Sequence, residues 1–60
     1  MLGFRIGESV VCHFARYEGR PATVVRLNPA DLEIGVVLNG GTGRVLWARG
    51  YELQRASDTA

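Results

Sequence analysis

The sequence predicts an all-β fold, in which five short strands close into a small barrel and a short 3-10 turn precedes the last strand. Three observations support this prediction. Apolar and polar residues alternate in segments such as Ser9 to Phe14, which is the two-residue period of a strand. No stretch repeats its apolar residues at the helical period. Glycine-rich segments separate the runs, and closure removes the exposed edges that short strands otherwise leave.

The individual strands follow from this alternation and from the turn residues between them. Asn28 and Pro29 open a turn, because proline fixes φ at its second position. Gly35 interrupts an alternating run and predicts a bulge or bend, as a barrel corner needs. We expect strands at 9–14, 22–27, 32–38, 44–48 and 53–55, a loop at 16–21, turns at 28–31 and 39–43, and a 3-10 turn at 49–52.

The predicted barrel is one domain, residues 4–55, followed by a flexible tail at 56–60. Trp47 can either fill the barrel or point outward as an anchor for a partner. The inward orientation is favoured, because it leaves Arg44 exposed. The predicted core consists of the apolar side chains on the inward face, namely Val10, Cys12, Phe14, Val25, Leu27, Ile34, Val36, Val45 and Leu53.

Length and composition limit the class of protein. A chain of 60 residues buries only about 60% of its extended-chain surface and is marginally stable alone. Its single cysteine, Cys12, cannot form an internal disulfide, and a free thiol is typical of the reducing cytoplasm. No signal peptide pattern and no apolar run near the roughly 18 residues of a membrane helix is present. We therefore expect a cytoplasmic protein that does not contact membranes.

No constellation of catalytic residues is visible. Cys12 and His13 are adjacent, so their side chains leave a strand on opposite faces and cannot form a nucleophile–base pair. The segment 39–43 is glycine-rich, but a phosphate-binding loop needs a following helix, and a strand is expected there. The carboxylates are scattered over turns, so nothing pairs them for acid–base chemistry. The sequence predicts no catalytic residue, no metal site and no cofactor, and therefore a protein that is not an enzyme.

The basic residues suggest a ligand. All seven are arginine, and the net charge is +1. Arginine binds phosphate oxygens with a planar fork and stacks on bases, although the codon bias of a GC-rich genome also explains the absence of lysine. Arg16, Tyr17 and Arg20 form a compact basic and aromatic group that can hold a base and phosphates; the alternative is a solvated loop paired with Glu18. Three further arginines can join this group if strand pairing brings them to one side, namely Arg26, Arg44 and Arg49.

The strands carry apolar residues on both faces. A solitary small barrel is expected to be apolar inside and polar outside, and exposed apolar patches usually mark an interface. The predicted outward positions that are nevertheless apolar are Val11, Val24, Val37 and Leu46. We therefore expect a homodimer or a homotetramer.

Two groups of residues resemble known families. Phe4 to Val10, Tyr17 to Val24, and the later positions Val45 and Leu53 resemble the pattern of SH3-like small barrels, which recurs in KOW-type domains of ribosomal proteins and transcription factors. This resemblance covers about residues 4–55 and implies an SH3-like barrel that contacts RNA or DNA.

A narrower resemblance is to the plasmid-borne type II dihydrofolate reductases, SH3-like barrels that assemble as tetramers around one pore. It rests on Phe4-x-x-Gly7-x-x-Val10, on Leu27-Asn28-Pro29, and on Val45 eight residues before Leu53. Where that family carries Val-Gln-Ile-Tyr along its pore, this chain has Val45-Leu46-Trp47-Ala48. Leu46 and Ala48 replace the residues that contact folate and nicotinamide.

The expected function is thus a small non-catalytic binding module that contacts nucleic acid through an Arg/Tyr loop. The alternative is a protein-interaction or homo-oligomeric assembly module, such as an accessory protein of a bacterium or phage. The remote alternative is a reductase of the type II dihydrofolate reductase kind.

Overall fold

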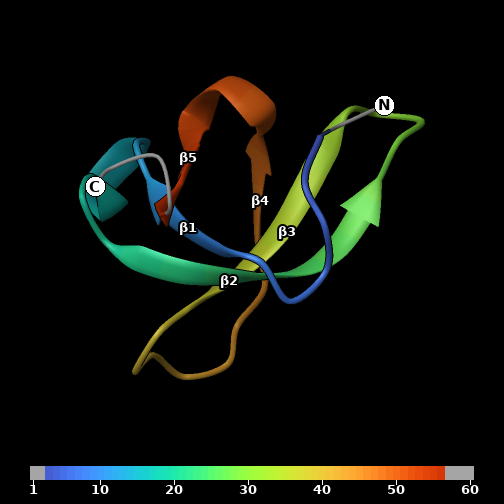
Figure 1. The fold of residues 1–60 in the computed structure, drawn as a ribbon. Helices are drawn as coiled ribbons and strands as arrows, with labels where there is room; N and C mark the ends of the chain where they lie inside the picture. The colour runs from blue at the N-terminus through green and yellow to red at the C-terminus, as the bar shows by residue number, and fades with distance from the viewer. Residues whose placement is uncertain (1–2, 57–60) are drawn as a thin grey trace.

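Residues 3–56, which a computed structural model of the chain describes, form one antiparallel sheet of five strands and no α-helix (Figure 1). The all-β prediction, the five strands and the 3-10 turn before the last strand are confirmed. Of the predicted tail, residues 57–60 lie outside the described part. The elements are β1 (Ser9–Cys12), η1 (Ala15–Tyr17), β2 (Pro21–Asn28), β3 (Glu33–Leu38), β4 (Leu46–Arg49), η2 (Gly50–Glu52) and β5 (Leu53–Arg55).

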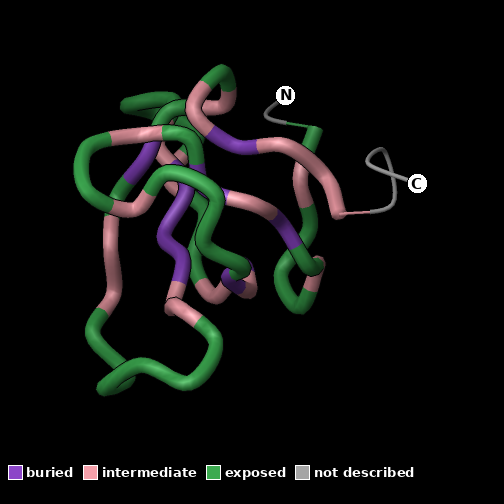
Figure 2. The backbone as a smooth tube through the Cα atoms, turned by 90° about the vertical axis from the view of Figure 1, so that its left-hand side faces the viewer, coloured by how far each residue is buried: buried purple, intermediate pink, exposed green. Residues whose placement is uncertain are grey.

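The strands follow one another across the sheet in the order β4-β3-β2-β1-β5. Within residues 3–56 no pairing joins β4 to β5, so the sheet is not closed into a barrel. Closure would need β4 to pair with β5, but these edge strands have only four and three residues, and the η2 turn lies between them in the chain. The sheet coils instead around an apolar interior, and the loop 39–45 projects from it as an exposed segment (Figure 2).

The core lies on one face of this coiled sheet. Partly buried apolar side chains pack against the core at its margins, namely Phe4, Phe14, Tyr17, Leu38 and Leu46. Five of the nine predicted core residues are fully buried, and Phe14 is half-buried. The buried residues are Val10, Cys12, Ala22, Val24, Ile34, Val36, Ala48 and Leu53.

The predicted phase of β2 is wrong because the strand carries a bulge. Val24 pairs with Val36 and Arg26 with Gly35, so Val25 has no partner on β3. The extra residue reverses the alternation: Val24 is fully buried, and Val25 faces away from the core. Leu27, opposite Ile34, returns to the core side but lies at its margin and is 36% exposed. The sequence pointed to a bulge at Gly35, whereas the bulge lies in the strand opposite.

The predicted phase of β4 is also wrong. Ala48 is buried and Leu46 packs on the core, whereas Trp47 is 48% exposed and Val45 lies on the opposite face. Gly35 explains this choice, because it pairs with Trp47 and leaves room for its neighbours. A Cβ atom at Gly35 would lie 3.0 Å from Cγ1 of Val45. The Val45 side chain thus occupies space that any other residue at position 35 would fill.

The turn 28–31 is confirmed by backbone and side-chain hydrogen bonds. The Asp31 N–H donates to the Asn28 carbonyl at 3.3 Å, and the Asn28 amide donates to the Asp31 carboxylate at 3.1 Å. Leu32, expected to begin the next strand, instead precedes β3 with a φ of +55° and is 57% exposed.

Candidate functional site

Two loops meet at one end of the sheet, which we call the loop end. Residues 13–20 join β1 to β2, and residues 39–45 join β3 to β4. The pairing of Ala22 with Leu38 places both loops at the same end. Between them lies a cavity of about 260 Å³, lined by Tyr17, Leu38, Gly41, Thr42, Gly43, Arg44 and Leu46.

Tyr17 is held at the centre of the loop end. The η1 turn positions it: its N–H donates to the Phe14 carbonyl at 3.0 Å, and its carbonyl accepts from the Arg20 N–H at 2.9 Å. The Tyr17 and Phe14 rings are tilted by 59° with centroids 5.6 Å apart. The Arg16 guanidinium lies 5.8 Å from the Tyr17 ring centroid, within cation–π range. The half-buried ring therefore contacts the core on one side and borders the cavity on the other.

The arginines of the loop end have no carboxylate partners. The ion pairs within residues 3–56 are His13 with Glu18, and Arg55 with Glu8. Neither involves Arg16, Arg20 or Arg44, all of which are exposed. Three guanidinium groups of the predicted site are thus free to meet an anion, and Glu18, the expected partner of the loop arginines, pairs with histidine instead.

The other two predicted site arginines lie elsewhere. Arg26 is on the face of the sheet opposite the core, where its guanidinium donates to the Val25 carbonyl at 3.0 Å. Arg49 ends β4, and its guanidinium donates to the Asp31 carbonyl at 2.6 Å. The Arg49 backbone N–H also donates to the Glu52 carboxylate at 2.8 Å. Arg49 thus ties the β2–β3 turn and η2 together, and its contacts are structural.

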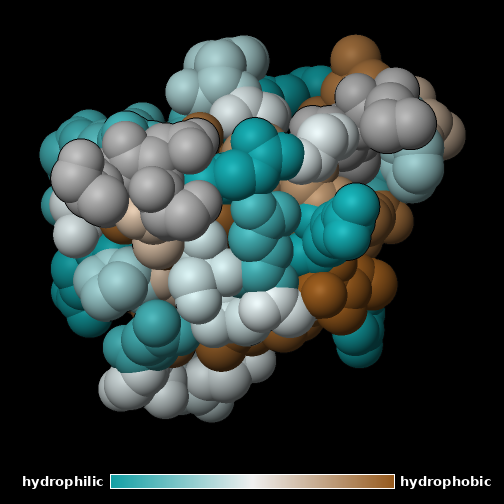
Figure 3. Space-filling view, viewed as in Figure 1, coloured by the Kyte–Doolittle hydropathy of each residue, from teal (hydrophilic) through white to brown (hydrophobic). Residues whose placement is uncertain are grey.

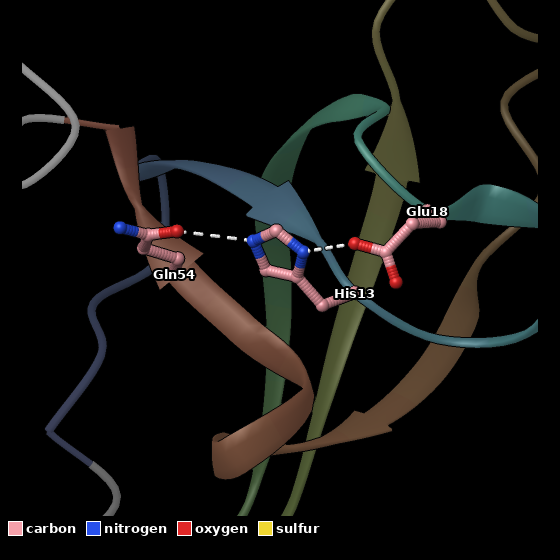
Figure 4. Close-up of polar contacts among 3 residues, drawn as sticks. All are labelled: His13, Glu18 and Gln54. Atoms are coloured by element: carbon pink, nitrogen blue, oxygen red, sulfur yellow. Dashed lines mark hydrogen bonds and ion pairs between the residues drawn. The ribbon is translucent and has the colours of Figure 1, made fainter.

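His13 makes contacts that sequence reasoning missed. Its Nδ1 faces the Glu18 carboxylate, and its Nε2 lies 3.0 Å from the Gln54 amide oxygen (Figure 4). Both nitrogens face acceptors, and only the protonated ring can donate from both. The hydrogen bond to Glu18, supported by that to Gln54, raises the pKa of His13 above its usual 6.5. Protonated His13 therefore fastens the loop 13–20 to β5.

Cys12 lies in the core, as expected. Its side chain is fully buried, and burial raises the pKa of the thiol, an effect that the charge of Arg20 partly offsets. His13, the next residue, is exposed. Within residues 3–56 no three His, Cys, Asp or Glu side chains lie close enough together to hold a metal ion.

The four predicted interface residues divide between the two faces of the sheet. Val24 is fully buried and Leu46 packs on the core, so neither is placed to meet a partner. Val11 and Val37 do face away from the core and are half-buried. They lie on the face of the sheet away from the core, which we call the outer face and which also carries Val25, Val45 and Trp47.

A second cavity lies at the opposite end of the sheet. It has a volume of about 680 Å³ and is lined by Gly3, Phe4, Arg5, Glu8, Leu27, Pro29 and Arg55. Arg55 is already engaged there: it donates to the Glu8 carboxylate at 2.7 Å and stacks 4.8 Å from the Phe4 ring centroid. Arg55 is therefore paired within the chain, whereas the exposed Arg5, which lines the same cavity, has no ion pair among the described residues.

The large exposed apolar side chains of the described residues are Ile6, Leu27, Leu32, Trp47 and Tyr51. The side of the molecule seen in Figure 3 is mostly hydrophilic, with hydrophobic side chains at its right-hand and lower margins. None of the described segments forms a helix long and apolar enough to cross a membrane. No protein-family model, curated protein or solved structure matches this chain.

Proposed function

We propose that this chain is a non-catalytic binding module that contacts nucleic acid through its loop end. One observation carries the proposal: two exposed arginines without ion pairs, Arg16 and Arg44, lie beside a half-buried tyrosine, and a third, Arg20, follows in the same loop. Guanidinium groups bind phosphate oxygens through pairs of charge-assisted hydrogen bonds. An aromatic ring beside them can stack on a base. The loop end therefore offers guanidinium groups for the phosphate of a nucleotide and an aromatic ring for its base.

The cavity favours an unpaired strand. Only an unstacked base can reach the Tyr17 ring, because the bases of a duplex are stacked on one another. Double-stranded nucleic acid would meet the exposed arginines through its phosphates alone. We therefore expect single-stranded RNA or DNA to bind more tightly than a duplex of the same length.

The SH3-like, KOW-type resemblance is part of this proposal, and the five antiparallel strands with η2 directly before the last are compatible with it. A reductase of the type II dihydrofolate reductase kind is disfavoured at the positions where this chain departs from that family. Ala48 is buried and Leu46 packs on the core, so neither is placed to contact a substrate. We therefore propose binding without catalysis.

The test measures binding of fluorescently labelled single-stranded RNA, single-stranded DNA and duplex DNA by anisotropy at several salt concentrations. Affinity should fall steeply with salt, because bound phosphates release condensed counterions. Arg44→Ala should weaken binding of all sequences and reduce the salt slope by about 0.7 for a single strand. Tyr17→Leu should lose the stacking of one base, worth about 1–3 kcal/mol, and Tyr17→Phe should retain it.

Arg5→Ala is the matched control, because it removes the same charge from an exposed arginine at the other end of the sheet. It should leave the salt slope unchanged. The proposal fails if no oligonucleotide binds at low salt, or if Arg5→Ala and Arg44→Ala weaken binding equally. Turnover of dihydrofolate with NADPH would favour the reductase instead.

A second candidate function is assembly. The exposed Trp47 and the half-buried valines of the outer face favour a protein contact on a surface separate from the loop end.

A further inference from the structure

The β4 strand is an open edge of the sheet. It pairs with β3 on one side, and within residues 3–56 no strand pairs with its other side. The Arg49 N–H donates to the Glu52 carboxylate, so it points away from β3. Because N–H groups alternate in direction along an antiparallel strand, the Trp47 N–H and carbonyl also point away from β3. Trp47 therefore presents a free donor and a free acceptor at the edge.

This edge lacks the features that usually prevent pairing. Exposed edge strands are commonly protected by lysine, by proline or by a bulge. The sequence of β4 is Leu-Trp-Ala-Arg, and Arg49, its one charged residue, is held at the end of the strand by its bonds to Asp31 and Glu52. At the centre stands an exposed tryptophan instead. Such a residue is a frequent anchor of protein interfaces.

We propose that two copies of this chain pair through β4, antiparallel, about a two-fold axis at Trp47. A symmetric interface must be self-complementary, and this register is. Trp47 lies opposite its own copy, Leu46 opposite Ala48 of the partner subunit, and Val45 opposite Arg49 of the partner subunit. No two charges of the same sign face each other across the axis, and Arg44 falls opposite a glycine.

The pairing satisfies both kinds of group that the edge leaves free. The Trp47 N–H and carbonyl exchange hydrogen bonds with those of the second copy, as in a hydrogen-bonded antiparallel pair. The two indole rings come to lie on one face with Cβ atoms about 5.5 Å apart, where aromatic pairs attract. The outer faces of the two copies then form one continuous surface. A four-residue edge buries less than the roughly 1,200 Å² of a stable complex, so the dimer is expected to be concentration-dependent.

Sedimentation equilibrium of the full chain, from low micromolar to millimolar concentration, measures the assembly. The mass should rise from 6.5 kDa toward twice that value. Trp47 is the single tryptophan, so its fluorescence should shift to shorter wavelength over the same range. Hydrogen exchange followed by NMR should show the Trp47 backbone amide becoming protected with concentration, which a contact through the outer face alone would not produce.

The Trp47→Lys variant should remain a monomer. Its circular dichroism spectrum should be unchanged, because the Trp47 side chain is 48% exposed and its replacement leaves the core intact. Tyr51→Lys is the control: it makes the same kind of change at an aromatic residue that is 86% exposed and lies off the edge, and it should dimerise like the wild type. The proposal is overturned by a mass that stays at 6.5 kDa throughout, by a dimer that survives Trp47→Lys, or by a dimer in which the Trp47 amide gains no protection.

Discussion

Gly35→Ala tests whether the close approach at the centre of the sheet decides the orientation of β4. The added Cβ would lie 2.8 Å from Cβ of Arg26 and 3.0 Å from Cγ1 of Val45. The first of these atoms is fixed to the backbone of β2, so it cannot move without shifting the strand. Overpacking of this kind costs about 1–3 kcal/mol. The lower entropy of the unfolded chain with alanine offsets about 0.4–1 kcal/mol of that cost.

The net loss should therefore lie between about 0 and 2.6 kcal/mol, with a central value of about 1.3 kcal/mol. The whole chain is expected to be stable by only about 3–9 kcal/mol, from about 0.05–0.15 kcal/mol per residue. Each kcal/mol lost lowers the Tm of so small a domain by about 4–8 °C. Urea and thermal unfolding followed by circular dichroism measure both quantities.

Gly50→Ala is the matched control, because its Cβ would meet only Cε2 of Phe4, at an ordinary 3.9 Å. It should be neutral or stabilising by up to about 1 kcal/mol. The reasoning is refuted if Gly35→Ala is as stable as the wild type, or if the two variants behave alike.

Three other predictions concern the turn, the histidine and the thiol. Leu32→Gly should raise the Tm, because leucine at a φ of +55° is 57% exposed and strained by about 1–2 kcal/mol, which exceeds the about 0.4–1 kcal/mol of chain entropy that glycine costs; a lower Tm would contradict this. The His13 pKa is higher in the folded state than in the unfolded state, so its stabilising contribution should be complete below about pH 6.5 and disappear as pH rises through the folded value. The difference in urea midpoint between wild type and His13→Gln, measured against pH, should shrink accordingly, and a difference that grows with pH would show the sign to be wrong. The Cys12 thiol, buried and with a raised pKa, should react with a disulfide reagent only after unfolding; fast labelling of the folded protein would argue against its burial.

The positions of the strands in the chain were predictable from local sequence, but which side chains of β2 and β4 point to the core was not. Alternation and glycine located all five strands and the η2 turn to within two residues at each end. In β2, Val24 and Val25 are equally apolar, and the bulge that selects Val24 depends on pairing with β3. In β4 the run from Val45 to Ala48 is apolar throughout, so its period carries no information about its inner face. Gly35, whose missing side chain leaves room for Val45 on the outer face, lies in β3 and not in β4.

Some residues of the candidate site were likewise predictable from local sequence, and others come together only through strand pairing. Arg16 and Tyr17 are neighbours in sequence, so a basic and aromatic group was visible at once. Arg44 borders the same cavity because two loops meet at one end of the sheet, which only strand pairing establishes. The contact of His13 with Gln54 joins residues 41 positions apart, and no local pattern indicates it.

The linear order of the sheet has a consequence for how the molecule opens. A closed barrel has no edge strand, whereas within residues 3–56 β4 and β5 each pair with a single neighbour. Local unfolding proceeds through cooperative units of unequal stability, so opening should begin at both edges and move inward. The strand left until last is β2, the longest of the five, which has a partner on each side. The chain thus has one slow-exchanging centre and two fraying ends, and the seam between β4 and β5 is where breathing motions of the fold should concentrate.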